Sequence, residues 1–280
     1  MIITQTQLAL TRKKAVLSTE IKNGVTDEVL YFAVDRKYAS LIAKDASVFL
    51  AAMHLPMAKM GQPISMDTAV SGRLVKELKT ANRVVRRRSR HFGTARIVAP
   101  VLTTDRTGKF RACFFTGDEK SCRLFLKRFK VSQKITHLIF VAGFNGAYGD
   151  SALVQRIGKI AHAQNIKLIV VRTNIRDVTD PIADWNFVSV GVLAAVGFFL
   201  RRGFKRILVP SLTRKTYSVL DAGWISETLD GLKAPRVYPK TLIWKVRAYI
   251  RDLDARFLRF RLYRFLARSG IIRRQQPALL

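Results

Sequence analysis

Acidic residues are scarce in this chain, which has 19 Asp and Glu against 50 Lys and Arg and therefore a formal net charge of +31. So much charge of one sign repels itself in a folded protein and calls for an anionic counterpart. Nucleic acid, an anionic membrane face, an acidic polysaccharide and an acidic protein are the candidates. The alternative is a solvated basic surface with no binding role, because net charge bears on association and not on fold.

Cysteine and histidine are also few. Cys113 falls in an expected strand and Cys122 in the first turn of an expected helix, so the sequence offers no disulfide framework and fits a reducing, cytoplasmic compartment. The four histidines lack the i, i+3 or i, i+4 spacing of a metal-ligand pair, and they are His54, His91, His137 and His162. We therefore expect no metal site and no catalytic residue, and we interpret His137 as a buried core residue.

Long hydrophobic runs are missing as well. No run reaches the roughly 18 apolar residues of a spanning helix. The nearest, 187–200, has the length of a core helix and is followed by Arg201 and Arg202. The first ten residues lack the basic and then apolar pattern of a signal peptide. We expect a cytoplasmic protein whose membrane contact, if it has one, is peripheral to the inner face.

From residue 95 onward, short apolar runs alternate with helical patterns. Strands that are apolar throughout and alternate with helices indicate a parallel sheet covered on both faces. We therefore predict an α/β fold with a doubly wound, mostly parallel sheet. The expected strands are 95–102, 110–115, 135–142, 166–172 and 206–209, and the expected helices are 121–129, 150–164 and 185–200. Ligands of such sheets bind beyond the carboxyl ends of the strands, which places four loops on one rim, at Gly117, 143–149, 173–180 and 211–218.

The first 92 residues predict a smaller α+β region. Two β-prone runs, 15–21 and 29–34, surround Asn23-Gly24, which is typical of a hairpin turn. Asp45 and Ser71 are candidate N-caps of the two helices that follow. The predicted organisation has three parts, which are this region over 1–92, the α/β domain over 93–235 and a basic helical tail over 236–280.

One stretch combines a strand end, a glycine turn and a helix start. The run 112–115 is apolar, Gly117 allows a tight turn, and a helical pattern begins at Ser121. This arrangement presents free backbone N–H groups to an anion. The loop Thr116-Gly117-Asp118-Glu119-Lys120-Ser121 resembles the Ser-Gly-Gly-x-Asp-Ser loop of PP-loop ATP pyrophosphatases, with Asp118 and Lys120 at the positions of its second glycine and its aspartate.

Over about residues 28–230, the order and spacing of several pieces resemble the bacterial adenine nucleotide α-hydrolase-like proteins of the PP-loop superfamily. Besides the loop, these pieces are Leu30-Tyr31-Phe32 to Ala52, Pro63-Ile64-Ser65 to Val75, the strand 135–142 with Gly143-Phe144-Asn145, Arg172-Thr173-Asn174-Ile175-Arg176, Asp184-Trp185 through Gly191 to Leu200, Val209-Pro210-Ser211 and Leu220-Asp221. The resemblance implies a PP-loop (HUP-like) fold. It also implies a residual nucleotide site built from Thr116, Gly117, Lys120, Ser121, Gly143 and Asn174. We expect no cofactor, and residual ATP binding at these residues is the alternative.

The departures from the family fall on polar positions of that site. Asn145 stands where the family has Asp, and Val190 stands where it has His. Asp118 and Glu119 add bulk and negative charge where a phosphate would need glycine backbone. Scaffold positions are kept while site positions are lost, so the balance favours a protein that is not an enzyme. Two alternatives stay open, which are an ATP-dependent adenylating or amidating enzyme, as in surface-polysaccharide biosynthesis, and an RNA-binding or tRNA-modifying protein.

Two basic segments are the stronger functional signals. Arg86, Arg87, Arg88 and Arg90 end the helix that Ser71 begins, and a basic amphipathic helix with interleaved aromatics is predicted over 240–274. Its candidate anion- and membrane-binding residues are Arg247, Arg251, Arg256, Phe257, Arg259, Phe260 and Arg264. Such a helix suits an anionic membrane surface, an RNA, or packing on its own domain or a partner. The leading hypothesis is a non-catalytic binding or scaffolding subunit at an anionic membrane surface or on an acidic partner.

Overall fold

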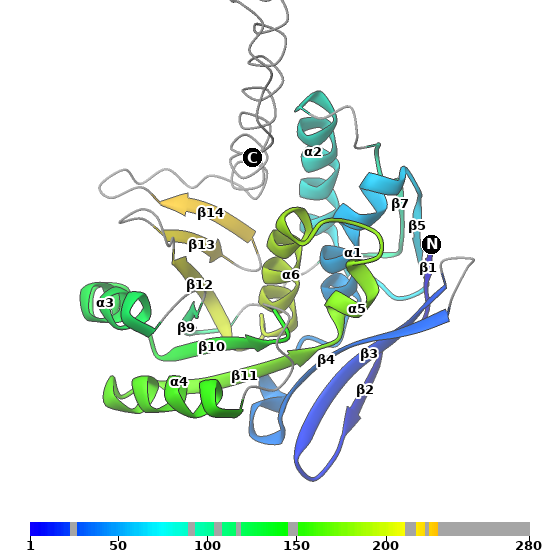
Figure 1. The fold of residues 1–280 in the computed structure, drawn as a ribbon. Helices are drawn as coiled ribbons and strands as arrows, with labels where there is room; N and C mark the ends of the chain where they lie inside the picture. The colour runs from blue at the N-terminus through cyan, green and yellow to red at the C-terminus, as the bar shows by residue number, and fades with distance from the viewer. Residues whose placement is uncertain are drawn as a thin grey trace, which may run out of the picture.

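The computed structural model describes residues 1–22, 27–88, 93–103, 108–115, 119–144, 151–210, 217–221 and 224–228. Within these residues, twelve strands form one sheet, and a separate two-stranded ribbon pairs β6 (Val70–Ser71) with β8 (Val101–Leu102). The order along the sheet is β14-β13-β12-β9-β10-β11-β4-β3-β1-β5-β7, with β2 paired to β3 (Figure 1). The strands of the sheet are β1 (Ile2–Ile3), β2 (Gln7–Leu10), β3 (Lys14–Lys22), β4 (Asp27–Asp35), β5 (Ile64–Met66), β7 (Ile97–Val98), β9 (Phe110–Phe114), β10 (His137–Ala142), β11 (Lys167–Thr173), β12 (Phe204–Pro210), β13 (Tyr217–Asp221) and β14 (Trp224–Thr228).

Four parallel strands form the centre of this sheet. β9 pairs with β10 and β12, and β10 pairs with β11, all in parallel. From β11 to β12 the spatial order is third, second, first and fourth along the chain, the order with which doubly wound nucleotide-binding sheets begin. The winding direction therefore reverses between β9 and β12. Antiparallel strands flank this centre, with β4 on β11 and β13 on β12.

Helices cover both faces of the parallel strands. α3 (Glu119–Phe129) and α4 (Ser151–Ala163) lie on one face, and α1 (Ser47–Met60) and α6 (Trp185–Phe199) lie on the other (Figure 1). Alternate residues of one strand serve the two layers: Ile139 and Val141 join the core with α1 and α6, and Leu138 joins the cluster with α3 and α4. The predicted α/β sheet with helices on both faces is confirmed.

The N-terminal region belongs to the same sheet. The predicted hairpin is present as β3 and β4, which pair antiparallel along their whole length. β4 then pairs with β11, and α1 packs on α6, so a single core runs from the N-terminal strands into the parallel strands. The remaining helices are α2 (Gly72–Arg88), α5 (Ile175–Thr179) and the 3₁₀ helix η1 (Arg36–Leu41). The boundary near residue 92 stays a prediction, and the parts on either side of it share this sheet and core.

Two local predictions differ from the structure. The expected strand 95–102 is divided into β7 and β8 around Pro100, because proline has no N–H to donate to a ladder. Its carbonyl instead accepts a hydrogen bond from Val70 N at 2.9 Å. The expected rim loop 173–180 contains the short helix α5. The expected turn at Asn23-Gly24 and the C-terminal helix 240–274 lie outside the described residues.

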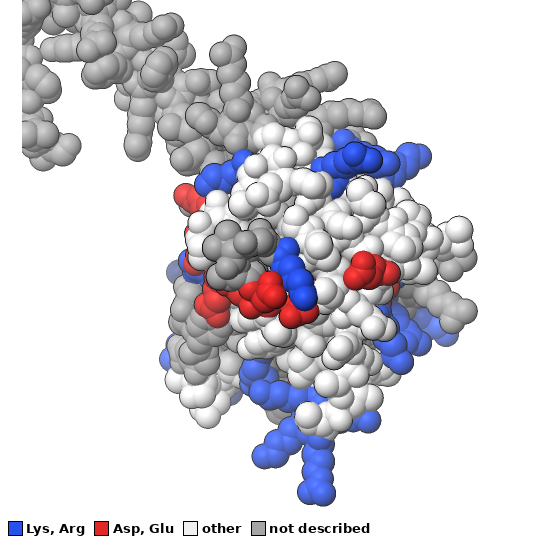
Figure 2. All heavy atoms as spheres, turned by 90° about the vertical axis from the view of Figure 1, so that its right-hand side faces the viewer, with Lys and Arg blue, Asp and Glu red and all other residues white. Residues whose placement is uncertain are grey.

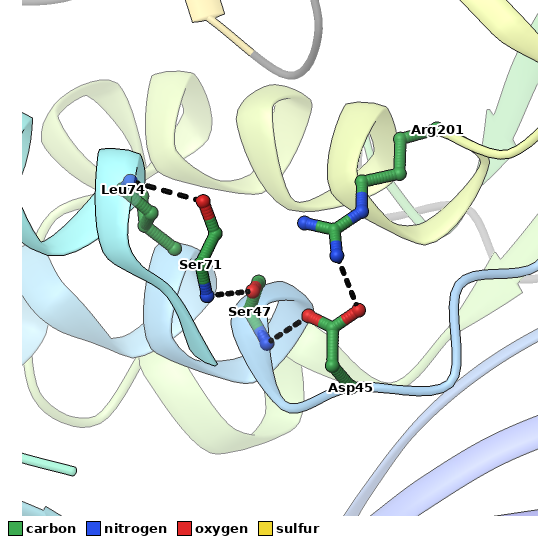
Figure 3. A network of polar contacts seen from close by, with 5 residues as sticks. All are labelled: Asp45, Ser47, Ser71, Leu74 and Arg201. Atoms are coloured by element: carbon green, nitrogen blue, oxygen red, sulfur yellow. Dashed lines mark hydrogen bonds and ion pairs between the residues drawn. The ribbon is translucent and has the colours of Figure 1, made fainter. Parts of the chain in front are cut away.

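A buried polar network ties three helix ends together (Figure 3). Arg201, directly after α6, donates from Nη2 to Asp45 Oδ2 at 2.6 Å, and Asp45 Oδ1 accepts from Ser47 N at 3.1 Å. Ser47 Oγ accepts from Ser71 N at 2.9 Å, and Ser71 Oγ accepts from Leu74 N at 3.2 Å. Ser71 caps α2 as predicted, whereas the N-cap of α1 is Ala46, and Asp45 lies one residue before it while still accepting the N–H of Ser47. Asp45 lies at a helix N-terminus and Arg201 at a helix C-terminus, where each charge is favoured by the helix dipole.

Candidate functional site

The reversal of winding between β9 and β12 marks the expected ligand position, beyond the carboxyl ends of the strands. Phe115 continues the ladder of β9, because its N–H donates to Ile139 O at 2.8 Å. α3 begins at Glu119, so the chain passes from strand to helix within a few residues, as the sequence predicted. The predicted site residues Thr116 and Gly117 lie outside the described residues.

The first turn of α3 holds the next two predicted site residues. Lys120 is exposed there, and Ser121 follows it in the helix. Glu119 Oε1 lies 2.8 Å from Arg156 Nε of α4. This ion pair joins the two helices on one face of the sheet. The carboxylate of Glu119, which the sequence predicted to lie beside a phosphate, therefore pairs with α4. The pair is partly exposed, with the side chain of Arg156 53% accessible and that of Glu119 35% accessible.

Gly143 ends β10 in a conformation that favours glycine. Its φ is 89°, in the left-handed region where a Cβ is strained. The next ring, Phe144, meets Trp185 edge-on with centroids 4.9 Å apart. The Arg176 guanidinium lies 4.8 Å from the centroid of the same Trp185 ring and 2.8 Å from Asp180 Oδ2. This stack of Phe144, Trp185 and Arg176 joins α5 and the start of α6 to the end of β10. The charge of Arg176 is paired with Asp180.

Asn174 follows β11 and uses its side chain as if it were strand backbone. Its Oδ1 accepts from Tyr31 N at 3.0 Å, and its Nδ2 donates to Val29 O at 2.7 Å. These bonds extend the antiparallel pairing of β11 and β4 by one more step. Contact with a nucleotide stays a prediction for Asn174, and its amide would have to leave β4 to make one. No local sequence pattern indicates this role, since the partner strand lies far away along the chain.

Two histidines among the described residues, His54 and His137, are buried in the core. His137, at the amino end of β10, is 4% exposed and lies between the rings of Phe110 and Phe204, at centroid distances of 5.2 and 5.0 Å. Burial, and then the charge of Lys167, lowers the pKa of His137 to about 4. The Thr136 hydroxyl lies 2.8 Å from its Nδ1. His137 is therefore a core residue, as the sequence indicated.

The thiols and the metal-binding groups offer no further chemistry among the described residues. Cys113 and Cys122 are buried and are not joined in a disulfide, and burial raises the pKa of the Cys113 thiol well above its usual value. Within the described part of the chain, no three His, Cys, Asp or Glu side chains gather as a metal site would require. That part also contains no helix with both the length and the apolarity of a membrane span.

Basic side chains line the outer faces of two helices. α2 buries Leu74 and Leu78, while Arg73, Lys76 and Lys79 are exposed. α3 buries Phe125 and Leu126 and exposes Lys120, Arg123, Lys127 and Arg128. On the face drawn in Figure 2, acidic side chains gather in the middle and Lys and Arg lie mainly around them.

The structure describes few of the predicted anion-binding residues. Arg86, Arg87 and Arg88 belong to the last turn of α2, but their side chains are not described. Arg90 and all the candidates of the C-terminal helix lie outside the described residues, namely Arg247, Arg251, Arg256, Phe257, Arg259, Phe260 and Arg264.

Comparison of the chain with protein-family models, with curated proteins and with solved structures found no match. The functional interpretation therefore rests on the residues and geometry described above.

Proposed function

We propose that this protein is a non-catalytic descendant of the PP-loop superfamily that acts as a binding or scaffolding subunit, peripheral to an anionic membrane surface. The observation that carries the proposal is the formal net charge of +31, which favours association with an anionic counterpart. Part of this charge lies on the outer faces of α2 and α3, which bury Leu74, Leu78, Phe125 and Leu126 on their inner sides. Those faces are therefore available to a partner without any change in the core.

The surroundings of the rim support a role without catalysis. Glu119 is paired with Arg156, Arg176 with Asp180, and the amide of Asn174 with β4. Each of these polar groups is satisfied within the protein. Catalytic groups are instead held ready for a substrate, with pKa values matched to their task. The two pKa values lowered to about 4 belong to His54 and His137, which are buried in the core.

The proposal predicts that the full chain co-sediments with vesicles that contain phosphatidylglycerol and not with vesicles of phosphatidylcholine alone. Changing Arg86, Arg87, Arg88 and Arg90 to Glu should weaken this binding, since each basic residue near an anionic surface contributes about 1 kcal/mol. The variant should melt at nearly the temperature of the native chain. If the native chain binds neither type of vesicle, the proposal is contradicted. If it binds RNA, and the four Arg to Glu changes weaken that binding, the RNA-binding alternative is favoured.

A second candidate is nucleotide binding, because the resembling loop joins β9 to α3 at the reversal of winding. Asp118 takes the place of the glycine that would let backbone approach a phosphate, so we expect titration calorimetry with ATP and Mg²⁺ to show no heat of binding. Gly117→Trp should then change nothing in this titration. Micromolar binding that Gly117→Trp abolishes would favour the adenylating or amidating enzyme.

A further inference from the structure

Two aliphatic side chains, Leu124 of α3 and Val131 of the turn that follows it, are exposed to solvent. Leu124 is 59% exposed and Val131 is 84% exposed, whereas Leu126 of the same helix is fully buried. A single exposed aliphatic residue on a surface needs no explanation. These two, however, lie among cations at helical spacing.

Lys120 precedes Leu124 by four residues and Lys127 follows it by three, so both flank it on the helix surface. Val131 comes four residues after Lys127. Among the residues that the structure describes, no acidic side chain pairs with either lysine, and Glu119 pairs across to α4. We name as the α3 surface the residues that share this outer side, which are Lys120, Arg123, Leu124, Lys127, Arg128 and Val131.

Backbone hydrogen bonds fix the position of Val131. The N–H of Lys130 donates to Leu126 O, and the N–H of Ile135 donates to Lys130 O, both at 2.9 Å. Lys134 adopts a left-handed conformation with φ of 51°, and its N–H donates to Val131 O at 3.1 Å. The turn is thus closed on itself with Val131 at its outside.

We infer that the α3 surface docks on the anionic membrane, with the cations at the lipid headgroups and Leu124 and Val131 entering the interface. This inference rests on the proposed function and names the surface that performs it. Apolar side chains between basic ones on an exposed helix are the pattern of proteins that lie on a membrane. α3 lies at the far end of the sheet from β1 and β5, with nothing of the described chain over its outer side (Figure 1).

The same residues fit the other anionic partners less well. A stable protein interface takes about 20–30 residues on each side, and the α3 surface is a short convex strip. Recognition of single-stranded nucleic acid uses aromatic rings on which bases stack. The two rings of α3 are turned inward: Phe125 is 9% exposed, and it packs on Phe129 with centroids 4.9 Å apart.

The test compares full-length variants in co-sedimentation with phosphatidylglycerol vesicles. Changing Leu124 and Val131 together to Asp should weaken binding at least about ten-fold, because both lose apolar burial in the interface. Lys127→Gln should weaken it about five-fold at low salt and less at high salt, since salt screens charge and not apolar insertion. Leu10→Asp is the matched control, because Leu10 is 49% exposed on β2, at a distance from α3 (Figure 1), and should leave binding unchanged.

A fluorescent label gives an independent measurement. Leu124→Cys can be labelled selectively with an environment-sensitive dye, because Cys113 and Cys122 are buried. Its emission should shift to the blue on phosphatidylglycerol vesicles, while a dye on Leu10→Cys should not respond.

The possible outcomes separate the inference from the proposed function. A native chain that does not sediment with vesicles overturns both. If the variant with Leu124 and Val131 changed to Asp binds vesicles as strongly as the native chain, and the dye at residue 124 shows no emission shift, the assignment of the α3 surface is wrong while the proposed function stands. If the same variants lose affinity for RNA instead of vesicles, the surface belongs to nucleic acid and the lipid assignment is wrong.

Discussion

Replacing Arg201 with Met should lower the free energy of unfolding by about 3–5 kcal/mol, the loss that follows when one partner of a buried ion pair is removed. The side chains of Arg201 and Asp45 are 6% and 13% exposed, so the remaining carboxylate would be left mostly buried and without the cation of Arg201. Asp45 also accepts the N–H of Ser47 at the start of α1. Urea unfolding at neutral pH, followed by circular dichroism, measures the change.

Two further variants show whether the effect comes from burial. Arg172→Met removes an exposed pair, in which Arg172 lies 3.7 Å from Asp35 with side chains 40% and 48% accessible, and should cost less than about 1 kcal/mol. Changing Asp45 to Asn together with Arg201 to Met should recover part of the loss, because no charge is then left buried. If Arg201→Met costs no more than Arg172→Met, the buried network does not hold the three helix ends as described.

Acid should destabilise the protein through its buried histidines. His54 lies in the middle of α1 with no exposed surface, and burial lowers its pKa from 6.5 to about 4, while the side chain of Asn82 acts in the opposite direction. Between these two pH values the unfolded chain binds a proton at His54 that the folded chain does not. Stability is therefore present above the unfolded pKa and is lost as the pH falls toward 4. For this shift the loss is about 3 kcal/mol.

The contribution of His54 can be isolated by substitution. His54→Met keeps a side chain of similar size that does not titrate, so its unfolding free energy should fall about 3 kcal/mol less than that of the native chain between neutral pH and pH near 4. The slope that remains includes His137, whose pKa is also lowered. His162→Gln is the control, because His162 is exposed at the end of α4 and should leave the curve unchanged. Identical pH curves for His54→Met and the native chain would mean that His54 is protonated without cost.

The elements that could be predicted were those with a strong local pattern. β9 to β12, α3, α4 and α6 are near their expected bounds, because continuous apolar runs and helical periodicity mark them. The short β1 could not be predicted, because its two residues form a strand only by pairing with β3 and β5, which are distant in the sequence. α5 was missed for a similar reason. It is a single turn of helix whose Ile175 and Val178 are buried against the core.

The candidate site could be located from the sequence more readily than its residues could be interpreted. The alternation of strands and helices placed the loop after β9 on the ligand-binding rim, and the strand order agrees. The role of Asn174 as a substitute for strand backbone depends on Tyr31 and Val29, and no local pattern reveals partners so distant. The α3 surface was not predicted, because Lys120 was interpreted only as part of the nucleotide site, while Lys127 and Arg128 were weighed only as part of the net charge. The signal that could have found it was the pair Leu124 and Val131 at seven-residue spacing among them.

The pairing of β4 with β11 sets the order in which the sheet can be completed during synthesis. β4 leaves the ribosome early, but Tyr31 meets Asn174 across 143 residues of chain. Until β11 has emerged, one edge of the N-terminal hairpin has no partner strand, and unpaired edges invite pairing with other chains. The nascent protein therefore carries an aggregation-prone edge while these 143 of its 280 residues are made, and a chaperone that binds extended segments would act on it before residue 167. The same separation makes folding slow, because a long loop must close before the central contacts form.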